Sequence, residues 1–91
     1  RHEVITMRIR DLREDSDLTQ REIAEYLHIR QNTYSQYENG QRQLPIDVLI
    51  ALAKYYHTST DYLLGLTDQR EPYKKLLYIV LKTVFNHVII Y

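Results

Sequence analysis

Apolar side chains in this chain recur every three or four residues, which is the spacing of helices that bury one face. The runs are short, and turn residues such as Asp15-Ser16-Asp17 separate them. The pattern therefore predicts an all-α fold of five helices, which begin near Met7, Gln20, Gln31, Pro45 and Thr60.

The pattern is clearest in residues 19–40. Thr19 and Glu22 can form a capping box, in which each side chain bonds the backbone N–H of the other, so a helix begins at the next residue after Thr19. Only residues 28–30 separate this helix from a second one. The polar side chains that the second helix turns outward are Gln31, Asn32, Ser35 and Gln36. Two short helices joined by a tight turn suit a reader of the DNA major groove, because Gln and Asn can each form a bidentate pair with adenine.

Further residues extend this pattern over roughly residues 7–66. They are Thr19-Gln20, Ala24, Leu27, Ser35, Tyr37-Glu38, Gly40, Leu52-Ala53 and Asp61-Tyr62-Leu63-Leu64-Gly65. With them the chain resembles the lambda-repressor and Cro-like family, also called the XRE family of bacterial and phage regulators. The resemblance implies a five-helix lambda-repressor-like DNA-binding domain. Its implied function is sequence-specific transcriptional regulation, as a dimeric repressor that reads a pseudo-palindromic operator in double-stranded DNA through the major groove.

The resemblance also implies roles for individual side chains. Base contacts are expected from Gln31, Asn32, Ser35 and Gln36. Contacts to the DNA backbone are expected from Gln20, Arg30, Asn39, Gly40 and Arg42. The family pairs the acidic residue near the end of the reading helix with an arginine of the first helix, so Arg13 and Glu38 are expected to form a structural ion pair.

Two histidines depart from the family pattern. His28 stands where the family commonly has Gly after the second helix, and His57 occupies the equivalent place after the fourth. Both positions are expected to need a positive φ, which His tolerates better than most residues other than glycine.

Length and composition restrict the function further. From ninety-one residues we expect one small domain, without room for a separate ligand-binding domain. The absence of cysteine excludes disulfides and thiolate metal sites. No signal peptide or membrane span is evident, so we expect a cytoplasmic, nucleoid-associated protein of bacterial or phage origin, with no cofactor and no small-molecule ligand.

The formal net charge is zero, which argues mildly against nucleic-acid binding, because DNA affinity depends largely on phosphate neutralisation. Near the predicted reading helix, three arginines are offset by three glutamates. If Glu38 is buried against Arg13, the surface that faces DNA is weakly positive.

The ends of the chain are expected to be separate segments. Residues 1–6 are interpreted as an N-terminal extension or a cloning remnant, residues 7–66 as the DNA-binding domain, and residues 67–91 as a linker and a dimerisation segment. A helix from Pro72 to about Asn86 would carry an apolar stripe, and a short strand over residues 88–91 is an alternative. The expected dimer contacts in the stripe are Tyr73, Leu77, Val80, Leu81, Val84 and Val88.

Other functions receive less support. Four histidines share no metal-ligand spacing, Ser35 lacks a base to activate it, and most inward tyrosines are expected to pack in the core, so an enzyme or a metal site is disfavoured. The main alternative is an antitoxin-like protein-interaction module that binds a partner protein through the apolar C-terminal tail. A structural helical oligomer is a third possibility, supported only by the neutral charge.

Overall fold

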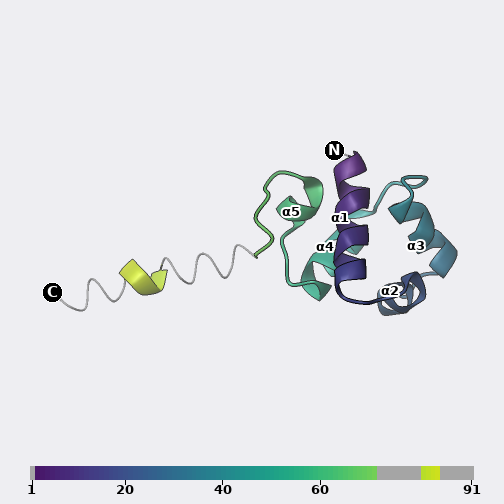
Figure 1. Cartoon of the computed structure of the whole chain (residues 1–91), viewed down its shortest axis with the longest axis horizontal. Helices are drawn as coiled ribbons and strands as arrows, with labels where there is room; N and C mark the ends of the chain where they lie inside the picture. Colours follow the sequence, from purple (N-terminus) through teal and green to yellow (C-terminus); the bar gives the residue numbers. More distant parts are fainter. Residues whose placement is uncertain (1, 72–80, 85–91) are drawn as a thin grey trace.

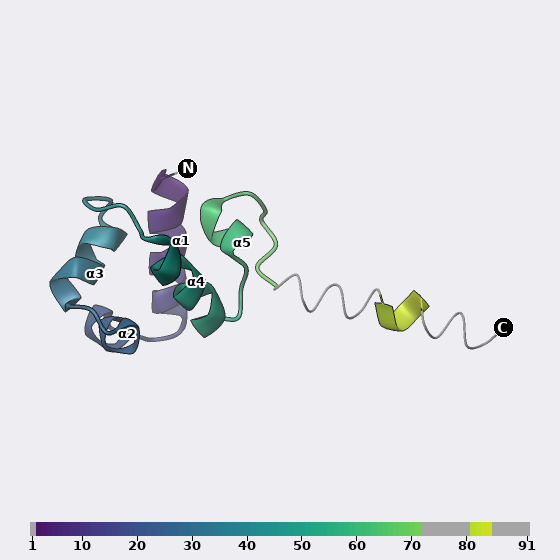
Figure 2. The same cartoon turned by 180° about the vertical axis from the view of Figure 1, so that it is seen from behind.

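The computed structural model describes residues 2–71 and 81–84. Its main helices, in chain order, are α1 (His2–Asp15), α2 (Gln20–Leu27), α3 (Gln31–Glu38), α4 (Ile46–Tyr55) and α5 (Thr60–Leu64). In Figures 1 and 2, α1 stands between α3 on one side and α5 on the other, and α2 closes the end of the domain next to α3. The described residues contain no strand, and the predicted all-α fold is confirmed.

The hydrophobic core takes at least one side chain from every helix. The most deeply buried apolar side chains are Ile9, Leu12, Ile23, Tyr34, Leu52 and Leu63. Because α1 supplies Ile9 and Leu12 and contacts both α3 and α5, it is the element that fixes the two sides of the domain relative to each other.

All five helices end in the same way, with a residue in the left-handed backbone region. These residues are Asp17, His28, Gly40, His57 and Gly65, with φ between 54° and 80°. At each end the following N–H bonds a carbonyl five residues back, for example Ile29 N to Ala24 O at 3.0 Å and Thr58 N to Ala53 O at 2.9 Å. This is the Schellman arrangement, which satisfies the last carbonyls of a helix and turns the chain sharply. The predicted positive φ at His28 and His57 is confirmed.

The N-terminal boundaries are set by side chains in two helices. Thr19 and Glu22 form the predicted capping box on α2, and the Ser59 hydroxyl accepts from Tyr62 N at the start of α5. The N–H bond from Thr19 holds the pKa of the Glu22 carboxyl below its usual value. These contacts fix where the short helices begin.

Three local predictions need correction. Helix α1 begins at His2, not near Met7, so residues 2–6 are helical. Pro45 is the N-cap of α4 and has φ −65° and ψ 154°, rather than lying in the first turn. Asn39 and Gly40 are both residue types suited to a left-handed backbone after α3, but Asn39 keeps a right-handed backbone with φ −89°, so Gly40 alone supplies the left-handed residue.

The early start of α1 has a packing reason. Ile5 packs on the core one turn before Ile9, and Val4 lies against Gly65. A Cβ added to Gly65 would come within 2.9 Å of Val4 Cγ1, so a glycine is required both by φ +80° and by this close approach. The first turns of α1 therefore belong to the packed domain.

The predicted dimerisation segment lies mostly outside the described residues. Tyr73, Leu77, Val80 and Val88 are not described, and neither is the alternative strand over residues 88–91. Leu81 and Val84 fall in one helical turn, residues 81–84, and are 58% and 55% exposed. In the part of the chain that is described, no helix has the length and hydropathy needed to cross a membrane.

Candidate nucleic-acid interface

Helices α2 and α3 meet through a turn of three residues. The left-handed His28 ends α2, and Arg30 is the N-cap of α3, in extended backbone. Arg30 provides no side-chain hydrogen bond to the first turn of α3. The two helices therefore have the predicted helix-turn-helix order, and no side-chain cap covers the first backbone N–H groups of α3.

The outer face of α3 is formed by the four residues predicted to contact bases. Gln31 and Asn32 are exposed, whereas Ser35 and Gln36 one turn later are half-buried. Ser35 Oγ accepts weakly from Asn39 Nδ2 at 3.4 Å, which leaves its hydroxyl proton available. The exposed amides thus lie at the N-terminal end of the helix.

The opposite face of α3 is fixed by a buried carboxylate. Glu38 is 1% exposed, and Arg13 of α1 forms a forked pair with it, from Nε to Oε2 at 2.6 Å and from Nη2 to Oε1 at 3.1 Å. The Tyr34 hydroxyl donates to Oε2 at 2.6 Å, and Gln20 Nε2 donates to Oε1 at 3.1 Å. We call these residues, with Arg10, the Glu38 network.

Arg10 and Tyr34 were not foreseen as partners of Glu38. Arg10 Nη2 donates to the backbone carbonyl of Glu38 at 3.2 Å, and its Nε lies 3.6 Å from Oε1. Both contacts could have been inferred from the helical spacing of these residues in the sequence. Arg10 lies one helical turn before Arg13, and Tyr34 lies one turn before Glu38, so each can share a face with the predicted pair.

The network keeps Glu38 ionised. Burial alone would raise the pKa of this carboxyl, but hydrogen bonds from Arg13, Tyr34 and Gln20 outweigh burial and leave the pKa below its usual value. The bond to Glu38 raises the pKa of Arg13, and burial followed by the bond to Glu38 raises the pKa of the Tyr34 hydroxyl. The charge of Glu38 is therefore compensated inside the domain.

Gln20 connects the start of α2 with this network. One N–H of its side-chain amide is used on Glu38, and an amide nitrogen carries a second N–H. Because Gln20 is only half-buried, the second N–H can reach a group outside the protein.

The remaining predicted backbone contacts lie at the two ends of α3. Arg30 precedes α3, and Asn39, Gly40 and Arg42 follow it. The loop after α3 is held by Gln36, whose carbonyl accepts from Gln41 N at 2.9 Å and from Arg42 N at 3.2 Å. The exposed Arg30 and Arg42 side chains thus bracket the outer face of α3.

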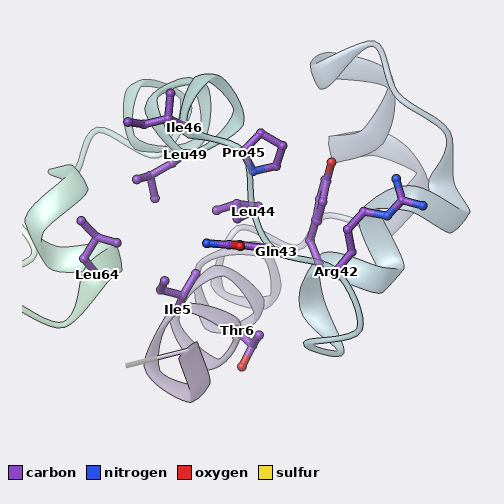
Figure 3. A pocket seen from close by; sticks show the side chains of 10 residues that line it. Ile5, Thr6, Arg42, Gln43, Leu44, Pro45, Ile46, Leu49 and Leu64 are labelled. Carbon is purple, nitrogen blue, oxygen red and sulfur yellow. The ribbon is translucent and has the colours of Figure 1, made fainter.

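An apolar groove of about 670 Å³ borders the same loop. Figure 3 shows Ile5, Leu44, Leu49 and Leu64 gathered along the groove, with Arg42 at its other side. Ile46 at its rim is 75% exposed. The groove is a second apolar surface of the domain, distinct from the outer face of α3.

Tyr34 and Tyr37 pack in the core, as expected for inward tyrosines, and are 0% and 6% exposed. Tyr56 and Tyr62 are half-buried. Tyr26 and Tyr55 pack ring to ring with centroids 4.5 Å apart. Within residues 2–71 and 81–84, no three His, Asp or Glu side chains gather as metal ligands.

Acidic side chains dominate the domain as a whole. All twelve Asp and Glu residues precede Pro72, whereas three of the four lysines follow it. Glu25 on α2 is paired with Arg21 at 3.3 Å, both side chains being exposed. The positive charge beside α3 is therefore local and comes from Arg30 and Arg42.

Comparison with known proteins now decides the family. Residues 9–63 match the family model described as helix-turn-helix, which covers the described helices from α1 into α5. The chain belongs to the helix-turn-helix family. The resemblance to XRE-type regulators is thereby confirmed, and the family is one of DNA-binding regulators, not of enzymes.

Three members of this family are similar to the chain. It is 42% identical over 65 residues to the HTH-type transcriptional regulator YobD of Bacillus subtilis, covering 71% of this chain and 58% of that protein. It is 43% identical over 58 residues to the regulator ImmR of the same organism, covering 64% of this chain and 46% of ImmR. It is 38% identical over 53 residues to the cryptic phage CTXphi transcriptional repressor RstR of Vibrio cholerae, covering 58% of this chain and 48% of RstR.

The chain spans about half the length of these curated relatives. No solved structure matches it.

Proposed function

We propose that this protein is a sequence-specific double-stranded DNA-binding transcriptional regulator that acts as a dimeric repressor. In this proposal α3 enters the major groove, and Gln31, Asn32, Ser35 and Gln36 contact base edges. Membership in the helix-turn-helix family and the names of the three relatives, two regulators and a repressor, support the proposal.

The observation that carries the proposal is the contrast between the two faces of α3. Tyr34, Tyr37 and Glu38 are buried on one face, where Tyr34 and Glu38 are also hydrogen-bonded, while Gln31 and Asn32 are exposed on the other. A helix whose inner face is fixed this firmly presents its outer amides in a set direction, which is what a bidentate contact to adenine requires.

Contacts to phosphate would position α3 in the groove. Gln20 has a second amide N–H, and Arg30, Asn39, Gly40 and Arg42 lie at the ends of α3, where the DNA backbone passes a helix in the major groove. Since the rest of the domain is acidic, only this local surface favours DNA.

A homodimer would provide the affinity that one unit lacks. One helix-turn-helix unit reads few base pairs, and two units about one DNA turn apart, roughly 34 Å, read a pseudo-palindrome. The apolar stripe of residues 72–91 is the segment that we assign to the dimer interface.

Selection from a random pool of DNA duplexes tests the proposal. We expect the full-length protein to enrich a pseudo-palindrome with adenine at one or more positions of each half-site, because Gln31, Asn32 and Gln36 favour adenine. A pool that shows no enriched sequence after repeated rounds would contradict sequence-specific binding.

A second candidate function is supported by the apolar groove beside Ile46. The groove lies beside the outer face of α3 and shares Arg42 with the proposed DNA contacts, and exposed apolar surface often contacts another protein. An antitoxin-like module that binds a partner protein, through this groove or through the apolar tail, would have such a surface. A full-length protein that is monomeric and has no preferred duplex favours this candidate.

A further inference from the structure

The linker between the domain and the C-terminal segment, residues 67–71, is bound to the domain at several points. From α1, Arg8 Nη1 donates to the carbonyl of Thr67 at 2.7 Å, and Arg8 Nη2 donates to Asp68 Oδ1 at 2.8 Å. From the turn after α4, the Thr58 hydroxyl donates to the carbonyl of Arg70 at 2.6 Å. Three of these five residues are therefore held by side chains of the folded domain.

The two anchoring side chains are themselves fixed. Arg8 is 12% exposed, its Nη1 also donates to the carbonyl of Tyr62, and its guanidinium lies over the Tyr62 ring at 4.2 Å from the centroid. Thr58 is 7% exposed. Because Arg8 is oriented by Tyr62 of α5, little side-chain freedom is lost when it binds the linker.

The linker follows α1 for about two turns. Its far end is paired with α1 again, from Arg70 Nη1 to Asp15 Oδ2 at 3.2 Å. Arg8 and Asp15 are seven residues apart, about 10 Å along a helix, so the linker is tied to α1 at two places about two turns apart.

We propose that Arg8 and Thr58 are positioning residues for operator recognition, which set the half-site spacing that the protein accepts. They fix the direction in which the chain leaves each domain, and hence the separation and rotation of the two α3 helices in a dimer. Only Glu71 lies between the anchored Arg70 and Pro72, where the sequence predicts the dimerisation helix to begin. This inference rests on the proposed dimeric function.

The size of the effect follows from DNA geometry. One added base pair moves a half-site by about 3.4 Å and turns it by about 35°, since a turn of 10–10.5 base pairs rises roughly 34–36 Å. A free linker of five residues would have an end-to-end distance of about 12 Å and would accommodate that shift. An anchored linker cannot accommodate that shift, so the anchors make the protein selective for the spacing between half-sites.

The experiment measures the affinity of full-length protein for duplexes that carry the selected half-sites at their preferred spacing and at spacings one and two base pairs longer or shorter. Wild type is compared with the double variant Arg8→Ala, Thr58→Val, which removes both anchors. Thr6→Val is the matched control, because the Thr6 hydroxyl bonds the Glu3 carbonyl within α1 and not the linker. A second variant with two glycines inserted after Arg70 keeps the anchors and frees only the C-terminal segment.

We expect wild type and Thr6→Val to lose about tenfold or more in affinity at shifted spacings, and both released variants to lose less than about threefold. Binding to an isolated half-site should be equal in all four proteins.

If the dimeric wild type binds shifted operators as well as the preferred one, the anchors do not set spacing, although the proposed function stands. If wild type is a monomer or selects no operator, the proposed function fails and this inference fails with it. Should the double variant not fold, the glycine insertion alone decides, and unchanged discrimination in it would overturn the inference.

Discussion

Two arginines of helix α1, Arg8 and Arg13, are similarly buried but bind acceptors of very different exposure. Arg8 binds the linker and α5, and Arg13 binds α3. Arg13, 14% exposed, pairs with Glu38, whose side chain is 1% exposed. Arg8, 12% exposed, binds two carbonyls and Asp68, whose side chain is 99% exposed. The arginines are alike in burial, and their acceptors are not.

The effect of removing each arginine depends on how buried its acceptor is. Without Arg13 a buried carboxylate loses its main partner, which costs stability and moves the helix that reads DNA. Without Arg8, the carbonyls of Tyr62 and Thr67 and the exposed Asp68 lose a donor, but no buried charge is left unpaired, so we expect the domain to fold and the linker to be released. Arg13 therefore maintains the fold, whereas Arg8 joins both α5 and the linker to α1.

The largest expected effect comes from removing the segment beyond the linker. Truncation after Glu71 keeps every residue of the core and both arginine contacts, so a folded monomer is expected. Its operator affinity should fall by about 100-fold or more, because binding by two linked units is lost. Light scattering and a binding titration measure this, with the full-length chain as control. A truncated protein that still dimerises and binds equally well would remove the C-terminal segment from the mechanism.

Arg13→Ala tests the buried side of the comparison. We expect the free energy of unfolding to fall by about 3 kcal/mol, near the low end for a broken buried pair because Arg10 also contacts Glu38. Urea denaturation measures the change. Arg21→Ala is the matched control, since it removes an exposed pair with Glu25 and should cost at most about 0.5 kcal/mol. Equal losses in Arg13→Ala and Arg8→Ala would show that the acceptor's burial does not matter.

Lowering the pH is expected to have a smaller effect on the stability of the fold. The folded state lowers the pKa of Glu38 below its value of about 4.3 in an unfolded chain, so the unfolded state binds more protons in that range and stability rises with pH there. The stabilisation from Glu38 is present above about pH 5 and is lost as the pH falls through its folded pKa. Glu38→Gln should be less stable at neutral pH, and its stability should fall less between about pH 5 and 3. Unfolding curves at several pH values that run parallel for the two proteins would refute this.

The sequence was sufficient to predict structural features that depend on residues close together in the chain. The capping box of Thr19 and Glu22 and the left-handed His28 and His57 each depend on neighbours along one helix end, and all are present in the structure. The fold class followed from apolar spacing, and the Arg13 to Glu38 pair came from the family resemblance. Roles in DNA contact stay predictions.

The sequence was insufficient to predict structural features that depend on contacts between residues far apart in the chain. Nothing local marks His2 as a helix start, and the contact of Val4 with Gly65 that stabilises it spans the whole domain. The Arg8 contacts to Thr67 and Asp68 cross about sixty residues of sequence. Ile5 could have been found, since it continues the stripe of Ile9 and Leu12 by one turn.

Base reading by the outer face of α3, with the DNA backbone held by groups at the ends of α3, is tested by comparing two variants. The affinity of Asn32→Ala and of Arg42→Ala is measured on the selected operator and on random duplex. Asn32→Ala should lose about 1–3 kcal/mol per half-site on the operator, with relaxed preference at one base pair and little change on random DNA. Arg42→Ala should weaken binding to both duplexes nearly alike. An Asn32→Ala protein that loses affinity equally for operator and random DNA would contradict base reading by α3.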